Sequence, residues 1–220
     1  MFGAQDGLVS TLAVVSAVGG ATGQTFPVLI AGIASALAGV FSMAAGEYFS
    51  SKSQREIFMA QIARERAEIA ERPAEAEAEV AYMLEREGLS EAASKRVAAE
   101  LARDPNVLLN TMVEKELGIL VEAGPSALQG AFVMGGSFGI AAIVPIVPYL
   151  FLPVVTAVLV SVPLAAAVMF ALGVVKSRWT QRSALVSGLE AVAVATVAGV
   201  AGFFFGSVLP GLLGVAGITT

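Results

Sequence analysis

The sequence contains no cysteine and no histidine among its 220 residues. Disulfide bonds are therefore excluded, and so are zinc sites built from Cys and His ligands. Any metal ion bound by this chain must be held by carboxylates, methionine sulfur, backbone carbonyls and water. Charge is scarce too: charged residues make up 14% of the chain, against roughly a quarter in a soluble domain. This composition favours a membrane protein.

Several functional motifs are also missing. No nucleotide-binding loop, nucleophile–base pair or cofactor motif is present, and we predict neither enzymatic activity nor a prosthetic group. The segment GGSFG (135–139) lies inside an apolar stretch, where close helix packing explains it better than phosphate binding. No basic stripe is available to neutralise phosphates, so nucleic acid is not expected as a partner.

Apolar sequence is abundant, at 56% of the residues. It is concentrated in five stretches of about 20 residues or more, enough to cross a hydrocarbon core about 30 Å thick. Lipid cannot satisfy backbone polar groups, so each stretch should be helical. The sequence therefore predicts an all-α membrane protein with five transmembrane helices. The stretches cover approximately residues 1–23, 26–49, 127–148, 150–175 and 184–209.

A charged, Glu-rich insert separates the second and third stretches. Fifteen of the 18 acids and nine of the 13 bases lie between Arg55 and Ala123. We predict helices over 53–72, from Pro73 to about Gly88, from the cap Ser90 to before Asp104, and over 107–118. Gly124-Pro125 should then break the chain before the third span. The predicted domains are residues 1–50 with two spans, the insert 51–124, and residues 125–220 with three spans.

The remaining bases predict the orientation. Lys52 and Arg55 follow the second span, and Lys176, Arg178 and Arg182 lie between the fourth and fifth spans. The other links carry no base. By the positive-inside rule, the insert and the N-terminus are cytoplasmic and the C-terminus is outside or lumenal. The composition suits a bacterial plasma membrane.

Few ionisable residues accompany the spans. Asp6 precedes an apolar run and needs a partner, a proton or a cation, unless it caps the first helix at the interface. Met43 and Glu47 share one helix face, and a thioether beside a carboxylate suits Fe²⁺ or Mn²⁺. Ordinary methionine packing with an interfacial glutamate is the alternative. Glu190 is either a proton or cation site or an interfacial residue near Arg182.

Carboxylates of the insert recur at helical spacing. They form pairs three or four residues apart, and one pair repeats the Met/Glu pattern of the second span. Facing helices that present such side chains can build a site for iron or manganese. The alternative is a solvated face on which Arg64, Arg66 and Arg72 pair with the acids. The pairs are Glu65 with Glu68, Glu75 with Glu79, and Met112 with Glu116.

Three segments resemble the vacuolar iron transporter family, which includes nodulin-like and bacterial members. FGAQDGLVSTLAVVSAVGGATG (2–23) is similar to its first span, and AGIASALAGVFSMAAGEYFSSKSQRE (31–56) to its second. EKELG (114–118) and PSALQGAFVMGGSFGIAAIVPIVPYL (125–150) resemble the end of its insert and its third span, including Pro-x-x-Pro-Tyr. The resemblance covers nearly the whole chain, in the same order. The polar segment that usually precedes the first span of the family is lacking.

The resemblance implies a homodimer with five spans per protomer that exchanges Fe²⁺ or Mn²⁺ for protons and moves metal out of the cytosol. Its ion path would lie between protomers, at Asp6, Met43 and Glu47. Its insert would bind metal through residues that match Glu65, Glu68, Glu79, Met112 and Glu116. One further family glutamate falls at Ala76, which leaves Glu75 or Glu77 to replace it. In a eukaryote the membrane would be vacuolar.

These observations lead to one hypothesis and two alternatives. The hypothesis is a proton-coupled transporter of divalent metal, whose acidic insert gathers ions at the cytoplasmic mouth. The first alternative is a membrane-anchored module that binds or senses metal without transporting it. The second, a transporter of an organic solute, is disfavoured because the spans offer few polar groups for recognition.

Overall fold

The computed structural model describes residues 1–117 and 126–212. In these ranges the chain is helical and contains no strand. Five helical segments are long and apolar enough to cross a membrane: Phe2–Thr22, Thr25–Glu71, Ala127–Phe151, Val154–Thr180 and Ala184–Leu212. The prediction of an all-helical chain with five candidate spans is therefore confirmed. The break predicted at Gly124-Pro125 lies outside the described residues.

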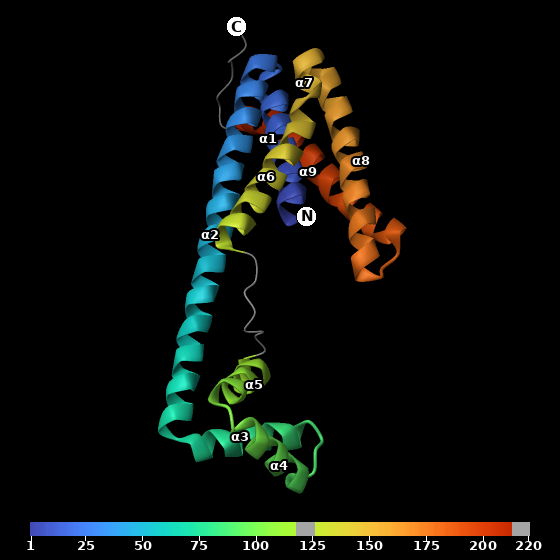
Figure 1. Cartoon of the computed structure of the whole chain (residues 1–220). Coiled ribbons are helices and arrows are strands. Elements are labelled where there is room, and N and C mark those ends of the chain that lie inside the picture. The colour runs from blue at the N-terminus through green and yellow to red at the C-terminus, as the bar shows by residue number, and fades with distance from the viewer. Residues whose placement is uncertain (118–125, 213–220) are drawn as a thin grey trace. The chain divides into compact units, whose positions relative to one another are not determined.

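The helices group into two compact units, residues 1–48 with 128–220 and residues 49–127. Helix α2 (Thr25–Glu71) begins in the first unit and ends in the second, and Figure 1 shows it as one continuous ribbon. The sequence predicted a span over 26–49 and a separate helix over 53–72. The helix does not stop between them because residues 47–71 contain neither glycine nor proline. The change in polarity at Ser50 therefore alters the surroundings of the helix, not its backbone.

Close packing of α1 (Phe2–Thr22) against α9 (Ala184–Leu212) organises the first unit. Glycines on α9 make this approach possible. A Cβ at Gly202 would lie 2.5 Å from the Ala13 carbonyl oxygen, and one at Gly206 would collide with the Ala17 carbonyl. Such contacts between small residues are the usual basis of helix association in lipid. Helix α8 (Val154–Thr180) packs on both α1 and α9.

Helix α6 (Ala127–Ile146) lies against α1 and α2 in the same unit. Its Phe138 backbone meets α1 at Gly7, and the Phe138 ring meets α2 at Gly39. Prolines then divide the third span, since α6 contains Pro145 near its end and the short α7 (Pro148–Phe151) follows. The Ser161 hydroxyl of α8 donates a 2.8 Å hydrogen bond to the Pro145 carbonyl and fixes this corner.

Large apolar side chains cover the outer surface of the spans. Phe41 on α2 is 72% exposed and Phe132 on α6 is 73% exposed. Only 11% of the apolar part of α2 is buried inside the protein. Exposed apolar surface on this scale is stable in lipid and would be unfavourable in water. The first unit is therefore built as an integral membrane body.

The second unit packs the end of α2 with three short helices, α3 (Pro73–Arg86), α4 (Glu91–Leu101) and α5 (Pro105–Leu117). As predicted, one helix begins at Pro73 and the next follows Ser90. The last begins earlier than residue 107 because Pro105 occupies its first turn and the Asp104 carboxylate accepts a hydrogen bond from Asn106 N–H at 2.8 Å. Lys115 of α5 pairs with Glu87, just after α3, at 2.7 Å.

Candidate functional site

Asp6 lies in the second turn of α1 and is half-buried. It lines a pocket of about 340 Å³ between α1, α8 and α9. The polar residues of this pocket come from all three helices: Gln5 and Asp6 from α1, Lys176 from α8, and Ser187 and Glu190 from α9. Apolar side chains, among them Met169, form the rest of the wall. A carboxylate in an apolar membrane helix thus shares its pocket with a basic group and a second acid.

Met43 and Glu47 occupy α2 and are both half-buried. Glu47 lies against α6, because a Cβ placed on Gly130 would be 3.0 Å from its Oε1 atom. The absence of a side chain at Gly130 leaves room for this carboxylate. Neither Met43 nor Glu47 lines the pocket that contains Asp6. The structure therefore brings Asp6 together with Glu190, while Glu47 lies at the α2–α6 contact and Met43 lies four residues before it on α2.

Glu190 lies in the first turns of α9 and is exposed. Its Oε2 atom is 3.6 Å from Nη1 of Arg182, in the link that precedes the helix. Glu190 thus lies near Arg182, and it also lines the pocket that contains Asp6. The pair is more than half exposed, so it contributes little to stability.

In the second unit, Arg72 connects two of the predicted metal-binding acids. Its guanidinium lies 3.5 Å from Glu68 and 2.9 Å from Glu75. Glu68 is half-buried on α2, as is Glu65 three residues earlier, whereas Glu75 is exposed on α3. Ala76, at the position of the missing family glutamate, is fully buried in the core. Glu75 precedes the half-buried Glu79 by four residues, so the two side chains share one face of α3. Glu77 instead lines a pocket together with Glu85 and Lys95.

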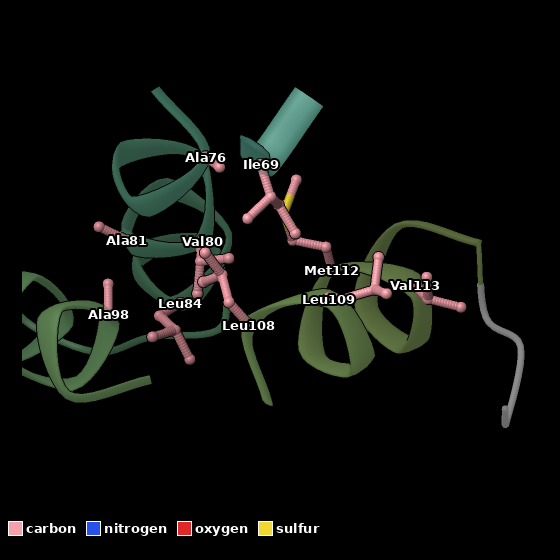
Figure 2. Packing of buried hydrophobic residues seen from close by; sticks show 10 residues of the cluster. All are labelled: Ile69, Ala76, Val80, Ala81, Leu84, Ala98, Leu108, Leu109, Met112 and Val113. Atoms are coloured by element: carbon pink, nitrogen blue, oxygen red, sulfur yellow. The ribbon is translucent and has the colours of Figure 1, made fainter. Parts of the chain in front are cut away.

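Met112 of α5 is fully buried. Figure 2 shows its side chain extending toward Ile69 near the end of α2, within one apolar cluster. The Met112 sulfur therefore belongs to the apolar core that Ile69 of α2 also enters. Glu116 lies near the end of α5, and its side chain is outside the described part. Across residues 1–117 and 126–212, no group of three or more acids is close enough to hold a metal ion.

One ion pair of this unit has a clear electrostatic effect. Lys95 Nζ donates a 2.6 Å hydrogen bond to Glu91 Oε1, one helical turn earlier on α4. This bond and the lysine charge lower the pKa of the Glu91 carboxyl below its ordinary value of 4.5. The same contacts raise the pKa of Lys95 above 10.5. Both groups are fully exposed, so the pair marks a solvated face of α4.

Two features of the first unit escaped the sequence analysis. Lys176 served only to predict the orientation, because Asp6, which lines the same pocket, lies 170 positions away in the chain. The Tyr149 hydroxyl is buried near the start of α7, and in the described residues it has no hydrogen-bond partner. Its position in the Pro-x-x-Pro-Tyr motif could have singled out Tyr149 from the sequence.

Known proteins match this chain along nearly its whole length. The sequence profile of the VIT family matches residues 1–207. The chain belongs to the VIT family. It is 32% identical over 204 residues to vacuolar iron transporter 1 of Eucalyptus grandis, covering 92% of this chain and 82% of that protein. It is 30% identical over 210 residues to vacuolar iron transporter 1 of Arabidopsis thaliana, covering 95% and 84%.

A third relative comes from a distant organism. The chain is 32% identical over 220 residues to the vacuolar iron transporter of Plasmodium falciparum, covering 95% of this chain and 80% of that protein. The resemblance drawn from the span motifs is therefore confirmed. Because the VIT relatives are named as transporters, the prediction that this membrane protein is not an enzyme is also confirmed.

Proposed function

We propose that this VIT family member exports Fe²⁺ or Mn²⁺ from the cytosol in exchange for protons. The observation that carries the proposal is that the largely apolar spans hold Asp6 in a pocket shared with Lys176 and Glu190, and hold Glu47 at the α2–α6 contact four residues after Met43. Relatives of nearly the same extent are named as iron transporters. Carboxylates can carry either metal or protons, so competition for the same oxygens couples the two fluxes.

Asp6, Met43 and Glu47 are proposed to form the membrane path at the interface of a homodimer. The exposed apolar face of α2, which includes Phe41, offers a surface for a second copy. Pairing of two copies there would place both sets of Met43 and Glu47 near one axis. Glu190 is proposed as an accessory charge at the same end as Asp6, compensated by Arg182.

Residues 51–124 are proposed to be a cytoplasmic domain that gathers metal. Glu65, Glu68 and Glu79 are half-buried, which supports a role beyond that of a solvated face. With Glu75, Met112 and Glu116 they supply the oxygen and sulfur ligands that Fe²⁺ and Mn²⁺ accept. Arg72 must release Glu68 and Glu75 when metal binds, because its ion pairs occupy their oxygens. The basic links support a cytoplasmic insert and N-terminus, with the C-terminus outside a plasma membrane or inside a vacuole.

Metal flux into proteoliposomes, with and without an imposed pH gradient, tests this function. The unmodified chain should move Fe²⁺ or Mn²⁺, faster with the gradient, and Asp6→Asn and Met43→Ala should each lose most of the flux. Matched controls are Met134→Ala, another half-buried span methionine, and Glu56→Gln, an exposed acid of α2. Full flux in Asp6→Asn and Met43→Ala would show the path assignment to be wrong. Metal binding without any flux would instead identify the non-transporting module.

A further inference from the structure

The pocket that contains Asp6 also holds a basic side chain, Lys176. Lys176 lies in the last turns of α8, whereas Asp6 and Glu190 lie in the first turns of α1 and α9. Three helix ends therefore bring two acids and one ammonium group to the same 340 Å³ space. Intramembrane charges are costly unless they are paired or hydrated.

The charges in this pocket can be assigned. Glu190 is compensated by Arg182, whose guanidinium is 3.6 Å away. In the described ranges neither Asp6 nor Lys176 forms an ion pair within 4.0 Å, so these two opposite charges face one pocket without fixed partners. A lysine ammonium on its flexible four-carbon stem can move toward a nearby carboxylate and away again.

We propose that Lys176 is the tethered counter-ion of Asp6 and that it competes with the transported cation for this carboxylate. The proposal rests on the function proposed above. In the absence of a bound ion, the ammonium moves across the pocket toward Asp6 and neutralises it. When a divalent ion binds Asp6, Lys176 is displaced but stays close, and its positive charge repels the ion. Binding is thereby kept weak enough for release, which every conduction pathway requires.

The role assigned to Lys176 is to tune cation affinity, so its test separates KM from the maximal rate. In proteoliposomes under a fixed pH gradient, Lys176→Gln should lower the KM for Mn²⁺ by about tenfold and slow the maximal rate severalfold, because release becomes limiting. Lys176→Met, which is also uncharged, should behave alike. Lys176→Arg keeps the charge and should restore values near those of the unmodified chain.

Arg178→Gln is the matched control, because it removes a base two residues away that does not line the pocket. It should leave both parameters unchanged. A KM that is unchanged or raised in Lys176→Gln would overturn the proposal. So would a fall in KM of equal size in Arg178→Gln, because the effect would then come from surface charge in general.

A second measurement does not depend on transport. In a double-mutant cycle on thermal unfolding in detergent, Asp6→Asn and Lys176→Gln should be coupled, because each single change removes the opposite charge that the other group faces across the pocket. The double variant should therefore lose less than the sum of the two single losses. Additive losses would refute the Asp6–Lys176 pairing even if metal flux is normal. Coupling in a chain that moves no metal would uphold the pairing and reject the proposed function.

Discussion

At the scale of single residues, Met112 combines two properties that are usually separate. It is a proposed metal ligand and a fully buried member of the core around Ile69. Met112→Leu conserves volume and should change the stability of the chain by less than about 1.5 kcal/mol. It removes the sulfur, however, and should weaken Fe²⁺ binding by roughly tenfold or more. Thermal unfolding and metal titration of the same sample measure the two effects.

Met112→Ala serves as the comparison. It leaves a cavity in the core, so it should lower stability by about 2–5 kcal/mol in addition to weakening metal binding. If Met112→Leu bound metal as tightly as the unmodified chain, Met112 would be a core residue only. The two variants thus separate packing from ligation.

Glu91 and Lys95 give a prediction about pH. The hydrogen bond between them lowers the pKa of Glu91 and raises that of Lys95. The stabilising effect of Glu91 is therefore present above its ordinary value of 4.5 and is lost as the pH falls through its lowered pKa. The stabilising effect of Lys95 is present below its ordinary pKa of 10.5 and is lost as the pH rises through its raised pKa.

Lys95→Met tests this ion pair. It removes the donor, so the pKa of Glu91 should rise back toward 4.5 in an NMR titration of its side chain. Glu100 is a useful internal reference because its partner is Arg103, which the substitution leaves in place. A Glu91 pKa that stayed low in Lys95→Met would mean that another group causes the shift.

The residues of the candidate site differ in how far sequence could predict them. An acid before an apolar run must find a partner, so Asp6 could be singled out from the sequence by the cost of burying charge. Lys176, which lines the same pocket, could not be singled out from the sequence, because only the packing of α8 against α1 brings it near Asp6. The burial of Ala76 was equally inaccessible, because it depends on how α3 turns toward its core.

At the scale of helices, the α1–α9 contact depends on glycine. Gly206→Ala would place a Cβ against the Ala17 carbonyl, so the two helices must separate. We expect a loss of about 1–3 kcal/mol, typical of overpacking. The measurement is the midpoint of thermal unfolding in detergent. Gly136→Ala is the control, because its Cβ would have no atom within 4 Å, and it should unfold at or above the normal midpoint. Equal midpoints for the two variants would contradict the packing.

The helices themselves were largely predictable, but their ends were not. Five apolar runs of sufficient length predicted five spans, because lipid permits few other backbone forms. The interruption expected between 49 and 53 does not exist, because polarity alone does not end a helix. Conversely, the third span is divided into α6 and α7 by prolines that hydropathy does not detect.

At the scale of the whole molecule, the absence of cysteine makes topology directly testable. Gln24→Cys places one thiol in the link between α1 and α2, and Ser183→Cys places one between α8 and α9. Both positions are exposed. With the proposed orientation, a membrane-impermeant thiol reagent should label Ser183→Cys only from the cytoplasmic side and Gln24→Cys only from the opposite side. Labelling of both from one side would contradict the five-span topology.

The corner between α6 and α8 has a mechanical consequence. The Ser161 hydroxyl donates a hydrogen bond to the Pro145 carbonyl across the turn. The Tyr149 ring of α7 is buried inside the bend. A proline-broken span would ordinarily be a place where a helix flexes. Here the Ser161 hydrogen bond braces the joint, so it should bend less than an unbraced proline break.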